Sequence, residues 1–399
     1  MKLPTKALTK TAVHLLLVGW ALYSILPFIW ASIGSTQVQR DAVARSPRFI
    51  PQFLVDNNLF FGVLIAVLVM LFIGWQMRSR PGGVGARQGV ALGIIGALIL
   101  IVFIALPALV GKQQLYEPTT DNFRDLWLSG SVDNFGVISL IFVLLVVGII
   151  ALLANADRLH IPKSAVYFGA TALFVAILFL LPQFVKFAEF YNFFLNSVII
   201  TVGTVIISIS IGCLAGYGLA RYSGIAGVVI LLVALAFRAL PRIAFVLPYY
   251  FFAKLTNLYD TYFLLITIMV AINQPFTIWM LRSFFMEIPR DLEEAAMIDG
   301  CNRLTAFTRV IIPVVWPGII TTGLFTVLLA YNEFLTVRLL TSTNWTLPVG
   351  IARFTSGEDT RYIPLSNASA VSITIPIVII VIFFQRYLVK GLVGGAVKG

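Results

Sequence analysis

The sequence is poor in charged residues, cysteines and histidines. Only 11% of its 399 residues are Asp, Glu, Lys or Arg, whereas soluble domains carry about a quarter, so most of the surface is not expected to face water. The two cysteines, Cys213 and Cys301, and the two histidines, His14 and His160, are isolated from one another. Their spacing suits neither a disulfide framework nor a zinc site. These shortages argue against a soluble globular enzyme and against catalytic metal chemistry.

A nucleotide-binding P-loop is also absent. No stretch matches G-x-x-x-x-G-K-[ST], and Gly111-Lys112 lacks both the preceding glycine and the following Ser or Thr. We therefore predict a transport subunit that is not itself an ATPase or another enzyme. If ATP drives its activity, hydrolysis takes place on another chain.

Long apolar runs make up most of the sequence. Hydrophobic residues account for 59%, the mean hydropathy is +0.97, and uncharged runs such as 191–220 exceed the roughly 20 residues that cross a hydrocarbon core. The predicted fold is an all-α polytopic membrane protein with about ten transmembrane helices. The run 11–33 is longer than a signal-peptide core and is predicted to be an uncleaved first helix. The expected spans are 11–33, 59–76, 89–110, 135–154, 164–182, 191–219, 225–247, 262–281, 318–340 and 369–388.

The net charge is +11. We attribute it to basic residues in loops, which set the orientation of a protein in a membrane. The basic residues lie in short loops between apolar runs and form no basic, aromatic-interleaved face, so nucleic acid is not an expected partner. Alternate loops are basic and the loops between them carry acidic residues, apart from one loop with Arg40, Arg45 and Arg48. The pattern predicts a multi-pass membrane protein with both termini in the cytoplasm.

The segment 282–317 is too charged to span a membrane. Pro289 can open a helix, because its missing N–H costs nothing in a first turn. Gly300 suits the left-handed position that ends one. A second short helix, 304–311, is expected to stop before Pro313. The first turn carries Asp291, Glu293 and Glu294, which complement the helix dipole. An apolar ridge follows at Ala295, Ala296, Met297 and Ile298.

This segment carries a family resemblance. EEAAMIDG followed by AFTRVIIP resembles the EAA loop of ATP-binding-cassette importer permeases. The wider pattern is similar to carbohydrate importers of the maltose-permease type and covers roughly 190–399. Matching pieces are NSVIITVGTVIISISIGCLAGYGLARYS (196–223), LPRIAFVLPYYFFAKLTNLYDT (240–261), PFTIWMLRSFFMEIPRDLEEAAMIDG (275–300), YNEFL (331–335), TLPVG (346–350) and QRYLVKGLVGGAVKG (385–399).

The resemblance implies a type I importer permease core with a cytoplasmic coupling helix, in the bacterial inner (plasma) membrane. It implies a transmembrane permease subunit that moves sugar, with an α-glucoside as the first expectation, by alternating access. Its implied partners are a second permease subunit, two ATPase subunits that hold ATP and Mg, an extracytoplasmic solute-binding protein, and membrane lipid. No cofactor is expected in this chain. The residues implied to dock on an ATPase are Glu293, Glu294, Ala295, Ala296, Asp299 and Gly300.

Several polar residues fall inside the expected spans. Arg238 and Glu333 are at similar depth by helix rise and are expected to form an ion pair. Pro275 allows a kink beside Asn273 and Gln274. Each such group could line the substrate pathway or only join neighbouring helices. The candidate pathway residues are Arg238, Asn273, Gln274, Tyr331, Asn332 and Glu333.

An external loop, 341–368, is the last candidate surface. By resemblance it touches a solute-binding protein, and without the resemblance it is an ordinary polar loop. The candidate contacts are Trp345, Arg353, Glu358 and Arg361.

The resemblance is incomplete in two respects. Members of this family have about six helices, and here residues 59–182 are predicted to insert four more. The predicted domains are an N-terminal helix and external loop (1–58), the insertion (59–182), and the permease core (183–399). Tyr331 also stands where a Trp is common before Asn-Glu, which leaves the sugar open.

Other functions remain possible from the sequence. The same machinery could import a polyol, a phosphodiester or an amine. An ion-coupled secondary transporter would need paired repeats, broken helices and coupling carboxylates near the midplane, where only Glu333 is a candidate. A membrane-embedded enzyme would need clustered His, Asp or Glu side chains.

Overall fold

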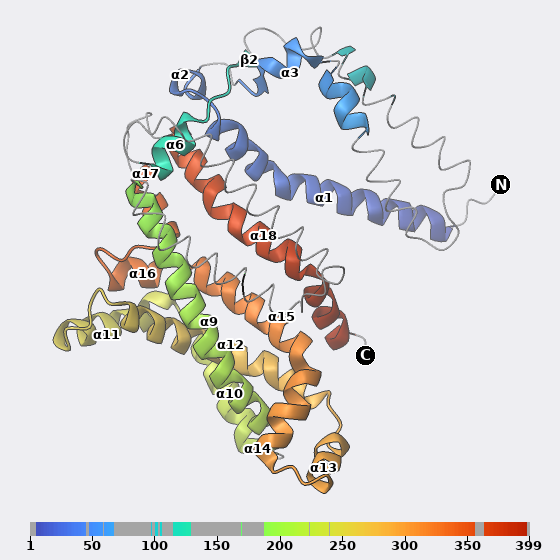
Figure 1. The fold of residues 1–399 in the computed structure, drawn as a ribbon, viewed down its shortest axis with the longest axis vertical. Helices are drawn as coiled ribbons and strands as arrows, with labels where there is room; N and C mark the ends of the chain where they lie inside the picture. Colours follow the sequence, from blue (N-terminus) through green and yellow to red (C-terminus); the bar gives the residue numbers. More distant parts are fainter. Residues whose placement is uncertain are drawn as a thin grey trace. The chain divides into compact units, whose positions relative to one another are not determined.

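The computed structural model describes a helical protein (Figure 1). It describes residues 5–44, 48–58, 60–67, 97, 100–102, 104–105, 115–128, 169, 187–222, 224–238, 240–355 and 363–396. The chain divides into two units. The first comprises Met1–Arg124 and Phe354–Val371, and the second comprises Asp125–Arg353 and Ser372–Gly399.

The first unit brings together segments that are far apart in the sequence. It contains α1 (Thr5–Ser35), α2 (Gln39–Ala42), β1 (Ile50–Pro51), α3 (Gln52–Asp56), β2 (Leu115–Tyr116) and the start of α6 (Asp121–Trp127). Strands β1 and β2 pair in parallel, with Ile50 opposite Leu115. The amide of Asn122 donates to the carbonyls of Ser35 and Gln37, both at 2.8 Å. These bonds hold the residues before position 59 against the residues that follow position 114.

The second unit holds most of the helices. They are α9 (Glu189–Arg221), α10 (Ile225–Arg238), α11 (Arg242–Leu255), α12 (Tyr262–Met286), α13 (Asp291–Ile298), α14 (Arg303–Ala306), the π-helical turn η2 (Phe307–Ile311), α15 (Ile312–Tyr331), α16 (Leu335–Leu340) and α17 (Leu347–Thr355). The last helix, α18 (Ile363–Ala396), begins in the first unit and ends in the second.

Helices α9 and α12 pack closely because α9 presents small residues to its neighbour. A Cβ at Gly216 would lie 3.0 Å from the backbone nitrogen of Arg282 and 3.1 Å from the Cβ of Leu281. Small residues at helix spacing allow backbones to approach in this way, and such contacts drive helix association in a membrane. The buried small residues of α9 are Ser197, Thr201, Thr204, Ser208, Gly212 and Gly216.

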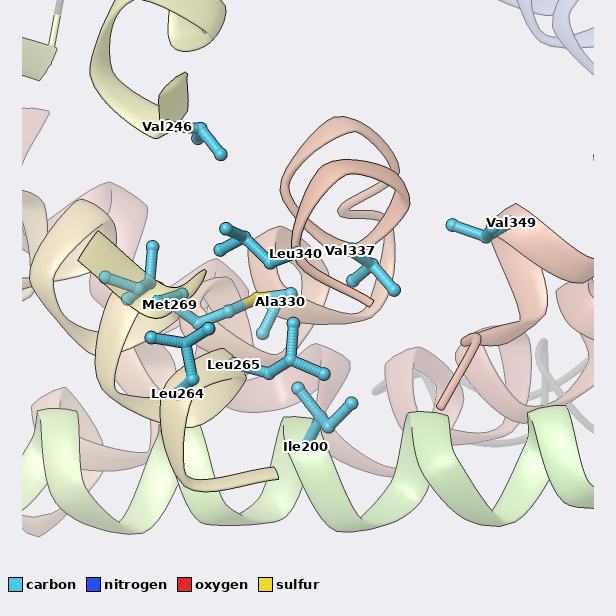
Figure 2. Packing of buried hydrophobic residues seen from close by; sticks show 11 residues of the cluster. Ile200, Val246, Leu264, Leu265, Met269, Ala330, Val337, Leu340 and Val349 are labelled. Atoms are coloured by element: carbon cyan, nitrogen blue, oxygen red, sulfur yellow. The ribbon is translucent and has the colours of Figure 1, made fainter. Parts of the chain in front are cut away.

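Two buried apolar clusters lie along this helix bundle. Figure 2 shows the first, in which Ile200 of α9 lies opposite Leu264 and Leu265 of α12, with Leu340 of α16 and Val246 of α11 above them. The second cluster forms around the far end of α12 and joins α9, α12, η2 and α15. Its members are Cys213, Leu281, Phe285, Ile288, Phe307, Ile311, Val315 and Ile319.

Four of the described helical segments are long and apolar enough to cross a membrane. They are Glu189–Arg221, Tyr262–Met286, Arg303–Tyr331 and Ile363–Gln385. Three of them, and α1, which contains the expected span 11–33, lie where the sequence predicts spans, whereas Arg303–Tyr331 overlaps the expected span 318–340 only over 318–331. They indicate an integral membrane protein. The expected spans 59–76, 89–110, 135–154 and 164–182 lie largely outside the described residues, so the total of about ten and the domain limits at 59 and 182 stay predictions.

The expected helix 225–247 is wrong, because the chain breaks between α10 and α11. Pro241 lacks an N–H and disfavours helical geometry in the residue before it, so α10 ends at Arg238 and α11 starts at Arg242. The expected span 318–340 is also interrupted, since α15 ends at Tyr331 and α16 begins at Leu335.

The expected stop before Pro313 is wrong as well. The helix continues from η2 directly into α15, where Pro313 falls in the first turn. A proline inside a continuous helix leaves one carbonyl without its N–H donor, and a local change to π geometry is one way in which a helix accommodates this loss. The wider π turn at Phe307–Ile311 immediately precedes α15.

Candidate functional site

The segment that follows α12 folds as a helix, a glycine turn and a second helix. Helix α13 begins at Asp291 with an acidic first turn and ends before Gly300, whose φ is +88°. The amide of Gly300 donates to the carbonyl of Met297 at 3.1 Å. The side chain of Asn302 then accepts from the amide of Thr305 at 2.8 Å and starts α14. The predicted left-handed glycine is confirmed, and the turn is sharp because only glycine adopts this φ without strain.

One side of α13 faces its own protein. Ala296 of α13 is buried within the chain. The carboxylate of Glu293 forms an ion pair with Arg221, the last residue of α9, and accepts a hydrogen bond from the hydroxyl of Tyr217 at 2.9 Å. Glu293 and Ala296 were expected on the docking surface, and the structure places them on the inner side of α13. Helical period explains the difference, because positions three apart share one face.

The other side of α13 is exposed and combines apolar with acidic side chains. Ile298 is 86% exposed, which is unusual for an isoleucine in a charged segment, and Leu304 is 66% exposed. Glu294, Ala295, Asp299 and Gly300 are exposed, and their docking on an ATPase stays a prediction. We call this the outer face of α13; it consists of Leu292, Glu294, Ala295, Met297, Ile298, Asp299, Gly300 and Leu304.

The expected ion pair between Arg238 and Glu333 is wrong. Glu333 pairs with Arg242, and its carboxylate also accepts from the amide and hydroxyl of Thr336 at 3.1 and 2.8 Å. Glu333 is therefore buried with a cation on one side and the first turn of α16 on the other. Arg238 instead lies over the ring of Phe276 at 4.7 Å, and its Nη1 has no hydrogen-bond partner among the described residues. The break at Pro241 places Arg238 at the end of α10 and Arg242 at the start of α11. The expected pairing assumed one continuous helix, in which the depth of Arg238 follows from its distance along the helix, and this assumption fails.

Two of the four remaining polar residues in the spans, Gln274 and Tyr331, join helices. Asn273 is buried in α12. The amide nitrogen of Gln274 donates to the carbonyl of Ser208 in α9 at 3.2 Å. The hydroxyl of Tyr331 donates to the carbonyl of Ile373 at 3.0 Å. Asn332 is exposed. These contacts correspond to the helix-joining alternative that the sequence left open.

Trp345 anchors the start of the expected external loop. Arg338 and Arg353 lie 5.3 and 5.4 Å from its ring, and its carbonyl accepts from the amide of Asn196 at 2.9 Å. Arg353 also pairs with Glu189. The other two candidates of this loop, at positions 358 and 361, lie outside the described residues.

Sequence reasoning missed the residues that hold these loops in place. Arg221 and Tyr217 fix α13, and Asp260 holds the loop 341–344 through hydrogen bonds from hydroxyl and backbone groups. Asp260 lies in the left-handed region, with a φ of 64°. The sequence Asp260-Thr261 is only a weak signal for a turn, so the role of this carboxylate was not predicted. In the part of the chain that the structure describes, no group of three or more His, Cys, Asp or Glu side chains gathers as a metal site would.

Comparisons with known proteins agree on one family. Residues 208–394 match the model of the binding-protein-dependent transport system inner membrane component. A probable ABC transporter permease protein of Sinorhizobium fredii is 36% identical over 210 residues, which cover 52% of this chain and 75% of that protein.

Two of the relatives are named for the disaccharides trehalose and maltose. The trehalose transport system permease protein SugB of Mycobacterium tuberculosis is 36% identical over 55% of this chain and 85% of its own length. The trehalose/maltose transport system permease protein MalG of Thermococcus litoralis is 37% identical over 51% of this chain and 74% of its own length.

Proposed function

Because the chain belongs to the family of binding-protein-dependent transport system inner membrane components, we propose that it is the permease subunit of an ATP-driven carbohydrate importer. The observation that carries the proposal is the outer face of α13. Its exposed isoleucine, methionine and leucines form an apolar surface beside two carboxylates. This composition fits a protein groove that takes up a helix by its apolar side.

The outer face is proposed to dock on a separate ATPase subunit that binds ATP and Mg. Closure of two such subunits on binding ATP would displace α13. The membrane-spanning helices would move with it, and the permease would change between outward-open and inward-open states. Helix α13 is bonded to the end of α9 through Glu293 and packs against η2, which leads into α15, so a force on it reaches two of the four apolar segments. A second permease subunit and an extracytoplasmic solute-binding protein complete the proposed complex.

The substrate class is proposed from the relatives that transport trehalose and maltose. Within the chain, Arg238 Nη1 and Gln274 Oε1 have no hydrogen-bond partner among the described residues and Asn332 is exposed, so these three side chains carry the pathway proposal. Tyr331 and Glu333 are engaged in contacts between helices or with the loop before α16. Trp345 and Arg353 are proposed to lie on the side that receives the solute-binding protein.

The alternative of an ion-coupled transporter is less well supported. Such a transporter needs a carboxylate that gains and loses its ion near the midplane. Glu333 is neutralised by Arg242 and bonded to Thr336, so its charge is already balanced within the fold. The proposed orientation is an inner-membrane protein with both termini in the cytoplasm, supported by the basic loops.

Affinity purification followed by uptake tests the proposal. The tagged chain is purified in mild detergent, its partners are identified by mass spectrometry, and the complex is reconstituted in proteoliposomes with radiolabelled trehalose or maltose. We expect an ATPase subunit and a second permease to copurify, and uptake to require hydrolysable ATP. Recovery of this chain alone in several detergents, with uptake that continues without ATP, would contradict the proposal.

A further inference from the structure

Arg221 and Glu293 form an ion pair between two elements that are 72 residues apart in the sequence. Arg221 closes α9, and Glu293 lies in the first turn of α13. The Nε of Arg221 donates to Oε1 of Glu293, and Nη2 lies against the same oxygen. The two side chains are only 17% and 14% exposed. A pair shielded in this way is screened less by salt than a surface pair and holds a fixed geometry.

The same arginine is bonded to a third element. Its Nη1 donates to the carbonyl of Phe285, near the end of α12, at 3.2 Å. Its own backbone carbonyl accepts from Nη2 of Arg290, which precedes α13, at 3.1 Å. Arg221 therefore connects the end of α9, the end of α12 and the start of α13 in one hydrogen-bonded unit.

Aromatic packing supports this unit from the side of the spanning helices. The hydroxyl of Tyr217 donates to Oε2 of Glu293 at 2.9 Å. Its ring lies 4.6 Å from Phe307 and 5.6 Å from Phe285 between centroids. Phe285 is fully buried and Phe307 nearly so. Glu293 is therefore bonded to a close-packed part of the helix bundle, and close-packed protein interiors deform little when a force acts on them.

We propose that Arg221 and Glu293 are a positioning pair that makes α13 and the adjoining ends of α9 and α12 move as one body. The proposal rests on the proposed function, in which an ATPase pulls on the outer face of α13. Helix α13 has eight residues and ends in a glycine turn. Without the pair, its displacement would be absorbed by bending of the short linkers on either side. Glu293 thus acts within this chain, while Glu294 faces outward.

Charge reversal tests the pair in the complete reconstituted complex. The variants are Arg221→Glu, Glu293→Arg and the double reversal, and Asp291→Asn is the control because it removes an exposed carboxylate from the same helical turn. The measurements are the ATP hydrolysed per radiolabelled trehalose or maltose imported, and the amount of ATPase subunit retained. We expect each single reversal to raise the ATP consumed per sugar by about tenfold, and the double reversal to return it to within about threefold of wild type. The ATPase subunit should be retained throughout.

Two results of that experiment would overturn the proposal. Single reversals that behave like Asp291→Asn would show that the pair transmits nothing. Loss of the ATPase subunit in Glu293→Arg, without recovery in the double reversal, would show that Glu293 contacts the ATPase directly.

A distance measurement keeps the test independent of the sugar. Spin labels are placed at Leu214 on α9 and Ile298 on α13, both exposed, after replacement of Cys213 and Cys301 by serine. In the purified full chain we expect one narrow distance distribution, a broad one in Arg221→Glu, and a narrow one again in the double reversal. An unchanged narrow distribution in the single variant would overturn the proposal. A wild-type complex that imports neither sugar would contradict the proposed substrate class, and the distance measurement would still decide the role of the pair.

Discussion

Arg242 and Glu333 form an ion pair between the first turn of α11 and the loop that joins α15 to α16. The glutamate is 5% exposed, whereas the arginine is 43% exposed, so the two ends of the pair differ in their contact with solvent or lipid. Loss of the arginine would leave a buried anion without a counter-charge. Loss of the glutamate would leave a cation that can still reach a polar environment.

The Arg242–Glu333 pair is therefore expected to respond unequally to substitution. Arg242→Met should destabilise the fold by about 2 kcal/mol, while Glu333→Gln should cost less, because the amide oxygen still accepts from Thr336. Thermal unfolding of the detergent-purified chain, followed by intrinsic fluorescence, measures both. Glu189→Gln serves as the control, since that carboxylate is 72% exposed in its own pair. Equal losses for Arg242→Met and Glu333→Gln would contradict the asymmetry.

A second prediction concerns Gly300. A Cβ at this position would meet no atom within 4 Å, so Gly300→Ala adds only the backbone strain of a left-handed alanine, about 1 kcal/mol. We expect the variant to fold and to retain less ATPase subunit on purification, because α13 is displaced. Gly218→Ala is the matched control: it is also free of steric contact, but it lies within α9, where alanine is favoured. Equal ATPase retention in both variants would refute the prediction.

A third prediction concerns the apolar part of the outer face. Ile298→Glu should leave the melting temperature of the isolated chain unchanged, because the side chain is 86% exposed, and should abolish copurification of the ATPase subunit. Leu255→Glu is the control, since Leu255 is 84% exposed at the end of α11. Retention of the ATPase subunit by Ile298→Glu would show that the apolar face is not the docking surface.

A fourth prediction follows from the pKa of Asp260. Burial by itself raises this pKa, but the hydrogen bonds donated by the loop 341–344 outweigh burial and hold the pKa well below its ordinary value. A carboxyl whose pKa is lowered by folding stabilises the fold above about pH 4, and this contribution is lost as the pH falls further. Asp260→Asn should therefore lower the melting temperature by a few degrees at pH 7. The difference from wild type should shrink as the pH approaches 3.

The control for Asp260 is Asp291→Asn, which removes an exposed carboxylate of α13. It should show a small effect at both pH values. If the difference in melting temperature between wild type and Asp260→Asn grew on acidification, the prediction that the ionised carboxylate stabilises the fold would be wrong.

The sequence predicted best the features that depend on local composition. The uncharged run that becomes α9 ends at a charged residue, and the structure ends the helix at Arg221. The left-handed conformation of Gly300 was predicted because the residues on both sides of it favour helix while the chain has to turn between them. The break before α11 was missed because Pro241 lies within a long apolar run, where hydrophobicity outweighs one residue.

The partners of the charged residues could not be predicted in the same way. Glu293 and Glu294 are adjacent in the sequence and differ by 100° around the helix, so one faces inward and the other outward. Which of them faces inward depends on Arg221, 72 residues earlier, and no local pattern carries that information. The pairing of Glu333 was likewise decided by the path of the chain after Pro241.

The backbone contact between the end of α6 and the start of α9 has a consequence for engineering. Leu128 and Phe187 form an antiparallel bridge, and the amide of Ala188 donates to the carbonyl of Trp127 at 2.9 Å. Antiparallel neighbours can be joined by a turn of about two to five residues. A turn of that length is therefore long enough to connect Leu128 with Phe187 directly, and such a connection requires no change in the path of α6 or α9.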